Sequence, residues 1–191
     1  MVRTRRLLLG LGVLLLVLGV WQVGEATYIH AKAWLAQRLV EGAWERTLAG
    51  ERAVTPWPWA DSWPVARLEA PGLGQRLIVL SGGSGRTLAF GPGHVDGSPL
   101  PGEPGNSIIG GHRDTHFRFL EHLRPGDIIR LQDRKGVTHG FRVTAVEVVD
   151  SRRARLDPTG ERPRLILVTC YPFDAVAPGG PLRYLVFADL E

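Results

Sequence analysis

The sequence contains one cysteine, Cys170, which ends an apolar run formed by residues 165–169 and precedes a turn-forming segment. A single thiol cannot form an internal disulfide, and exposure at the end of a strand indicates a reactive group. His112 also ends a strand-like stretch, and Arg183 begins another one thirteen residues after the cysteine. An imidazole and a guanidinium are therefore both candidates to partner a nucleophilic thiol.

The composition places these residues in one globular domain with an N-terminal appendage. The 191 residues are 44% hydrophobic and 22% charged, with a formal net charge of +4, which fits a folded core rather than a disordered chain. Three of the 23 basic residues precede the first acidic residue, Glu25, so 20 basic and 19 acidic residues remain, a net charge of +1. We therefore expect no nucleic-acid partner.

Residues 1–24 combine a basic start with an apolar segment. Leu7–Val23 is an apolar run of 17 residues that follows three arginines, near the short limit for crossing a bilayer core of about 30 Å. The arginines predict a cytoplasmic N-terminus, a single-pass anchor held by membrane lipid, and an exported remainder. A cleaved signal peptide shares the same features and is the alternative.

Residues 25–63 link this segment to the main domain. Glu25–Gly50 contains no proline and has apolar residues at helical spacing, which predicts an amphipathic helix that packs on the domain or the membrane surface. A partner-binding helix is the alternative. Thr55–Pro64 contains three prolines and three tryptophans, which predicts an extended strap along the domain, since large indoles are costly to expose.

In residues 64–191 the apolar residues follow the pattern of β-strands rather than that of helices. Eight short runs of β-branched or apolar residues alternate with Gly, Pro and Asp clusters, which predicts an all-β barrel or sandwich. The runs are Val65–Glu69, Gln75–Leu80, Thr87–Phe90, Ser107–Gly110, Asp127–Leu131, Gly140–Val149, Arg164–Thr169 and Arg183–Ala188. Thr115–Leu123 is the one short helix expected here, and residues 91–97 are expected to form a loop.

From Val65 onward the chain resembles the sortases, which are membrane-anchored cysteine transpeptidases with an eight-stranded closed β-barrel. Three motifs carry the resemblance, in the chain order of the family: IGGHRD at 109–114, LVTC at 167–170 and LRYLV at 182–186. The strap rich in proline and tryptophan is similar to that of the Gram-negative type, class GN, known from marine proteobacteria. The resemblance implies that His112, Cys170 and Arg183 form the active site.

The chemistry explains why such a site needs these residue types. A cysteine thiol has a pKa of about 8.5, and a nearby imidazolium favours the nucleophilic thiolate. Cys170 would attack a peptide carbonyl, and the planar fork of Arg183 would donate to the resulting oxyanion. His112 would protonate the departing amine and later deprotonate an incoming one.

The resemblance also implies the partners and the location. The donor would be an exported protein with a C-terminal sorting signal of LPXTG type, cut between Thr and Gly, and the acceptor would be an amine. The catalytic domain would lie in the periplasm, anchored in the inner membrane, and no cofactor is expected.

Other polar residues near the motifs are weaker candidates. Thr169 matches the family's Thr-Cys pair and would contact substrate, although strand alternation points its side chain away from that of Cys170. Asp114 is two residues from His112, but sortases do not generally depend on an acid that orients the imidazole. We expect no metal site, because Arg113 occupies the position where a zincin motif beginning at His112 requires glutamate.

Two other classes of function remain open from the sequence. A cysteine hydrolase would use the same three residues with water as the acceptor. A non-catalytic anchored binding module would keep the barrel and present its surface to a partner.

Overall fold

The computed structural model describes residues 2–177 and 179–191, which form two compact units, Met1–Arg38 and Leu39–Glu191. The first unit is part of a single helix, α1 (Val2–Leu48). The separate helices expected before and after Gly24 are therefore one helix, because a single glycine costs only about 1 kcal/mol in a helix interior.

Helix α1 is long and apolar enough to cross a membrane by length and composition, as a signal sequence near an N-terminus also would be. None of its most apolar window is buried within the protein. Large side chains such as those of Leu16 and Trp21 are more than 60% exposed. Burial in lipid would stabilise such a surface, which is consistent with the predicted single-pass anchor.

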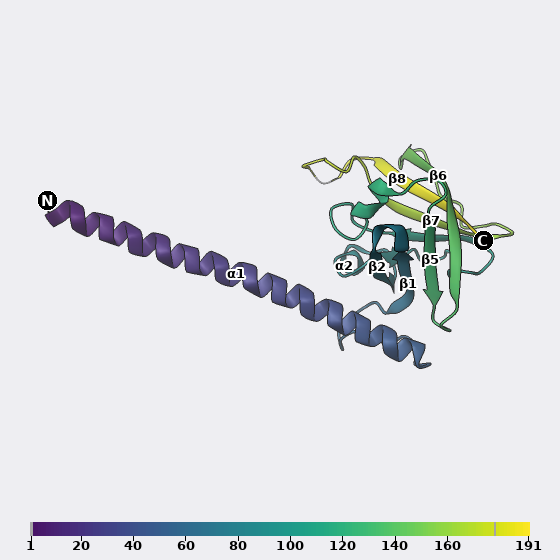
Figure 1. Ribbon diagram of the computed structural model, residues 1–191, viewed down its shortest axis with the longest axis horizontal. Coiled ribbons are helices and arrows are strands. Elements are labelled where there is room, and N and C mark those ends of the chain that lie inside the picture. The colour runs from purple at the N-terminus through teal and green to yellow at the C-terminus, as the bar shows by residue number, and fades with distance from the viewer. Residues whose placement is uncertain (1, 178) are drawn as a thin grey trace. The chain divides into compact units, whose positions relative to one another are not determined.

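The second unit is a closed eight-stranded β-barrel, as the resemblance to the sortases implied. Figure 1 shows its strands, which follow one another around the barrel in the order β1-β2-β3-β4-β7-β8-β6-β5. The strands are β1 (Pro64–Ala70), β2 (Gln75–Ser81), β3 (Gly93–His94), β4 (Gly105–Gly110), β5 (Ile128–Asp133), β6 (Thr138–Asp150), β7 (Pro163–Cys170) and β8 (Leu182–Leu190). The short helices are η1 (Pro71–Leu73), α2 (Gly85–Leu88) and η2 (Arg118–His122).

The expected strand at Thr87–Phe90 is wrong, because this part of the chain contains the helix α2. The Ser84 hydroxyl accepts a hydrogen bond from the Thr87 amide and caps the helix N-terminus, which favours a helical turn over an extended strand. The third strand instead lies within residues 91–97, which we expected to be a loop. There Gly93 and His94 pair with β2 on one side and β4 on the other.

The barrel interior is filled by one face of each long strand. In β7, Leu165, Leu167 and Thr169 are buried on the inner face, and the first two belong to the main hydrophobic core. The alternate residues, Ile166, Val168 and Cys170, share the outer face, where Ile166 is buried and Val168 and Cys170 are partly exposed. The period of two along the strand therefore places the thiol on the outside of the barrel.

The C-terminal end of α1 packs within the second unit, as the helix was predicted to do. Val40, Ala43 and Trp44 are buried, and the Arg67 guanidinium of β1 lies 5.6 Å from the centre of the Trp44 ring. Such a cation over an indole adds to the hydrophobic contact. The last turns of α1 are thus part of the barrel's packing.

The segment Thr55–Pro64 covers part of the barrel but is not extended throughout. Trp63 packs against the core, and the Trp57 ring meets Phe90 edge to face at 4.8 Å. A turn closed by a hydrogen bond from the Ala60 amide to the Trp57 carbonyl interrupts the segment. Contrary to the expectation, this turn leaves Trp59 83% exposed.

Candidate active site

The β7–β8 ladder places Cys170 beside Arg183. The two strands are antiparallel, and Cys170 and Arg183 are direct partners in their register. Side chains of directly opposed residues project from the same face of a sheet, with Cβ atoms about 4.5–5.5 Å apart. The thiol and the guanidinium therefore share the outer face of the barrel, although thirteen residues separate them in the sequence.

The β4–β7 pair brings His112 to the same end of the barrel. These strands are parallel, Gly110 is the partner of Val168, and the Gly111 amide donates to the Val168 carbonyl at 3.1 Å. His112 and Cys170 are each two residues beyond this last pair. Because parallel strands end at the same edge, both residues lie at that end of the barrel, and the His112 side chain is exposed.

The chain turns at His112 because an aromatic ring packs against Gly111. The Phe117 amide donates to the His112 carbonyl at 3.0 Å. This turn brings the buried Phe117 ring over Gly111, where an added Cβ would lie 2.6 Å from a ring carbon. The short helix expected from Thr115 to Leu123 is present as the 3₁₀-helix η2, which is preceded by turns and covers only Arg118–His122. His112 precedes this helix.

Thr169 lies on the inner face, next to Cys170 in the chain but pointing into the barrel. Its side chain is 2% exposed, and its hydroxyl donates to the Gly111 carbonyl at 2.7 Å. The hydroxyl therefore fixes the residue that precedes His112 against β7. This geometry supports the structural role that strand alternation indicated, while contact with substrate remains a prediction.

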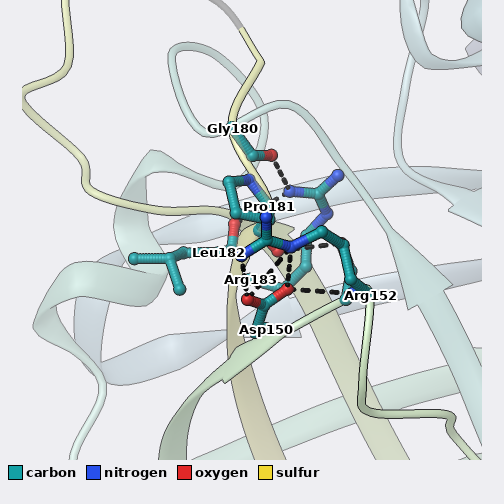
Figure 2. A network of polar contacts seen from close by, with 7 residues as sticks. Asp150, Arg152, Gly180, Pro181, Leu182 and Arg183 are labelled. Carbon is teal, nitrogen blue, oxygen red and sulfur yellow. Dashed lines mark hydrogen bonds and ion pairs between the residues drawn. The ribbon is translucent and has the colours of Figure 1, made fainter.

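Arg183 is held at one end of its guanidinium, as Figure 2 shows. Its Nη1 donates to the carbonyls of Gly180 and Leu182, at 2.8 and 2.9 Å. Within residues 2–177 and 179–191, Nε and Nη2 of this side chain make no hydrogen bond. The guanidinium is thus oriented by the backbone and keeps donors for a further acceptor.

The carboxylate of Asp150, close to β8, binds Arg152 rather than Arg183. Asp150 is the register partner of Leu182, and hydrogen bonds from the Arg152 side chain and backbone lower the pKa of Asp150 to about 2. Figure 2 shows this pair beside Arg183. Because Asp150 binds Arg152, it does not neutralise the positive charge opposite Cys170.

The carboxylate of Asp114 faces Arg113. Its Oδ1 accepts a hydrogen bond of 3.1 Å from Arg113 Nε, and the side chain is 67% exposed. If His112 acts as the resemblance implies, we expect Asp114→Asn to keep the reaction rate within about threefold of the wild type, since an amide oxygen can accept the same hydrogen bond. Steady-state kinetics with a sorting peptide check this. A loss of about 10⁴-fold, as for a triad carboxylate, would show that Asp114 orients His112.

His116 gives the folded chain a dependence on pH. Burial, together with the nearby His112, lowers the pKa of His116 below its ordinary value of 6.5. As the pH falls through 6.5, the unfolded chain binds a proton at this imidazole that the folded chain does not, so folding stability falls. We expect His116→Gln to reduce the loss of Tm between pH 7.5 and pH 5.5. His30→Gln, on α1, is the control. An equal loss of Tm in the wild type, His116→Gln and His30→Gln would contradict the prediction.

The closed barrel brings a cysteine, a histidine and an arginine to one end, and the comparisons with known proteins identify the family to which this fold belongs. A family model described as the sortase domain matches residues 68–191. The chain therefore belongs to the sortase family, whose members are cysteine transpeptidases.

Individual relatives agree with this assignment. The chain is 34% identical over 121 residues to sortase D of Bacillus subtilis (strain 168), and the match covers 63% of this chain and 60% of that relative. The chain thus matches less than two thirds of the length of this curated relative.

Solved sortase structures show the same fold. Sortase C-1 from Actinomyces oris matches with a TM-score of 0.60 and 30% identity, over 67% of this chain and 74% of its own. Sortase A from Corynebacterium diphtheriae matches with a TM-score of 0.62 and 25% identity, over 82% of this chain and 84% of its own.

Proposed function

We propose that this chain is a membrane-anchored sortase that forms a thioester on Cys170 and passes the acyl group to an amine. The observation that carries the proposal is the register of β7 and β8, which opposes Cys170 and Arg183, while β4 pairs with β7 as far as Gly110 and His112 follows two residues later at the same end of the barrel. A thiol, an imidazole and a guanidinium at one rim suit acyl transfer.

The first half-reaction cleaves the donor peptide. The Cys170 thiolate attacks the scissile carbonyl carbon and forms a tetrahedral intermediate, whose oxyanion accepts hydrogen bonds from Nε or Nη2 of Arg183. As the intermediate collapses, the C–N bond breaks and the His112 imidazolium gives its proton to the departing amine. The acyl part stays on sulfur as a thioester, and the imidazole is left neutral.

The second half-reaction reverses the roles of the same groups. The incoming amine attacks the thioester carbonyl, and His112 takes up the proton that the amine loses. Arg183 again donates to the oxyanion, and the thiolate leaves as the new amide forms. The imidazolium and the thiolate are both regenerated, so the cycle closes without a cofactor.

The substrate proposal follows the family. The donor is an exported protein that ends in an LPXTG-like sorting signal, and the acceptor is an amine at the cell envelope. The chain divides into an anchor at 1–24, a linker at 25–63 and a catalytic barrel at 64–191. The arginines before the apolar part of α1 support an inner-membrane anchor with the barrel in the periplasm, and the segment Thr55–Pro64 supports the Gram-negative type.

The proposal is tested by intact mass spectrometry of the full chain in detergent. After incubation with an LPXTG-containing peptide, we expect Cys170 to gain the mass of the acyl fragment that ends at the threonine. Added hydroxylamine should remove that mass and yield the hydroxamate at an increased rate. Products and rates that do not depend on the amine would instead identify a cysteine hydrolase, and the absence of an acyl adduct would support a binding module.

A further inference from the structure

The residue that follows His112 is a buried arginine, Arg113, which has no role in the proposed mechanism. The Arg113 side chain is only 4% exposed. Its guanidinium makes three hydrogen bonds to backbone carbonyls and one to a carboxylate. Because arginine is rarely buried this deeply without dedicated partners, the site is built around the charge.

All three carbonyls belong to the segment that follows Cys170. Arg113 Nη1 donates to Pro172 at 2.7 Å, and Nη2 donates to Ala175 at 2.9 Å and to Ala177 at 3.1 Å. Arg113 is adjacent to His112 in the chain, and Pro172 is two residues after Cys170. One planar group thus connects the backbone that carries the imidazole to the backbone that leaves the thiol.

We propose that Arg113 is a positioning residue, which fixes residues 171–177 against the His112 segment and so sets the geometry between the imidazole and the Cys170 sulfur. The inference rests on the proposed function, since His112 and Cys170 are taken to react together. Inside the barrel, the Thr169 hydroxyl already fixes Gly111 to β7. Arg113 makes the corresponding connection on the outer side.

The chemistry of the side chain suits this task. The guanidinium is planar, and its donors reach three carbonyls and the Asp114 carboxylate in fixed directions, whereas a lysine ammonium is a single charged point with three rotatable donors. Pro172 and Ala177 are exposed residues, so water can hydrate their carbonyls if the guanidinium is lost. Loss of Arg113 should therefore release residues 171–177 while the barrel stays folded.

The test measures acylation by folded enzyme in Arg113→Ala and Arg113→Lys, with the full chain in detergent and a sorting peptide as donor. We expect Arg113→Ala to lower kcat by about 10- to 100-fold, the scale of a small misplacement of reacting groups, while KM changes less than about threefold. Arg113→Lys should retain an intermediate rate. Hydrogen exchange over residues 171–177 should become faster in Arg113→Ala and stay unchanged elsewhere in the barrel.

Arg142→Ala is the matched control. Arg142 also donates to a carbonyl, that of Gly126, and to a carboxylate, that of Glu191. It lies seven residues from Val149, the β6 partner of Arg183, or about 23 Å along the strand. We expect its variant to react at the wild-type rate.

Three outcomes would overturn the inference. One is an Arg113→Ala protein that reacts within threefold of the wild type. Another is a rate loss in Arg113→Ala that is fully explained by the fraction of unfolded protein measured by circular dichroism. If Arg113→Ala does not fold, a folded Arg113→Lys that reacts at the full wild-type rate would also overturn the inference. A wild-type protein that forms no acyl adduct would refute the proposed function instead, and the hydrogen-exchange result would still decide whether Arg113 fixes residues 171–177.

Discussion

Cys170→Ala is expected to abolish both peptide cleavage and acyl transfer, with a loss of at least about 10⁴-fold, the scale seen when a covalent nucleophile is removed. The thioester needs the sulfur, and Cys170 is the chain's only thiol, so no neighbouring cysteine can replace it. The measurement is product formation by chromatography together with intact mass, where the acyl adduct should disappear.

The same variant separates both enzyme classes, which need the thiol, from a non-catalytic binding module. Cys170 is only partly buried, on the outer face at the end of β7, so alanine should leave the barrel folded with a Tm within a few degrees of the wild type. A Cys170→Ala protein that still cleaves the peptide would refute the proposed mechanism. Unchanged biological function of that variant would favour an anchored binding module.

Arg183→Ala is expected to lower the rate of acylation by about 10²- to 10³-fold, the range measured when one oxyanion donor is lost. Its Nη1 is committed to Gly180 and Leu182, and Nε and Nη2 are the donors proposed for the oxyanion. Arg183→Lys should recover only part of this loss, since an ammonium cannot bind two carbonyls and an oxyanion with the same planar geometry. Single-turnover acylation kinetics give both values.

Arg164→Ala provides the matched control for Arg183. Arg164 lies on β7, six residues before Cys170, and its guanidinium pairs with Asp189 of β8 on the exposed surface. Exposed pairs contribute about 0–1 kcal/mol, so this variant should keep its rate within about threefold. If Arg183→Ala and Arg164→Ala behaved alike, Arg183 would have no special role in the reaction.

Much of the fold could be predicted because long strands have a clear period. The runs that became β4, β7 and β8 are apolar and bounded by turn residues, and the expected strand ends at Gly110, Thr169 and Arg183 agree with the structure within one residue. Those ends are where the proposed site lies. The places of His112, Cys170 and Arg183 at strand ends therefore followed from the pattern, while their grouping into one site was implied by the resemblance to the sortases.

The wrong or missing predictions concern short segments, whose structure depends on local capping or on tertiary contacts rather than on a sequence period. Two residues of β3 are too few to show a period, and the cap at Ser84 outweighs the β-branched Thr87. The role of Arg113 was missed because its acceptors are backbone carbonyls 59 to 64 residues away. The types and spacing of side chains in the sequence give no indication of backbone partners. An arginine next to a predicted catalytic residue was the one available signal.

The parallel contact between β4 and β7 has a consequence for how the protein matures. Gly111 and Thr169, which meet through one hydrogen bond, are separated by 58 positions, and both β5 and β6 are formed by the chain between them. Contacts of such long range form late, because the intervening loop must first be closed. On the proposed mechanism, a newly made chain therefore becomes reactive only when β4 and β7 have paired and the barrel has closed.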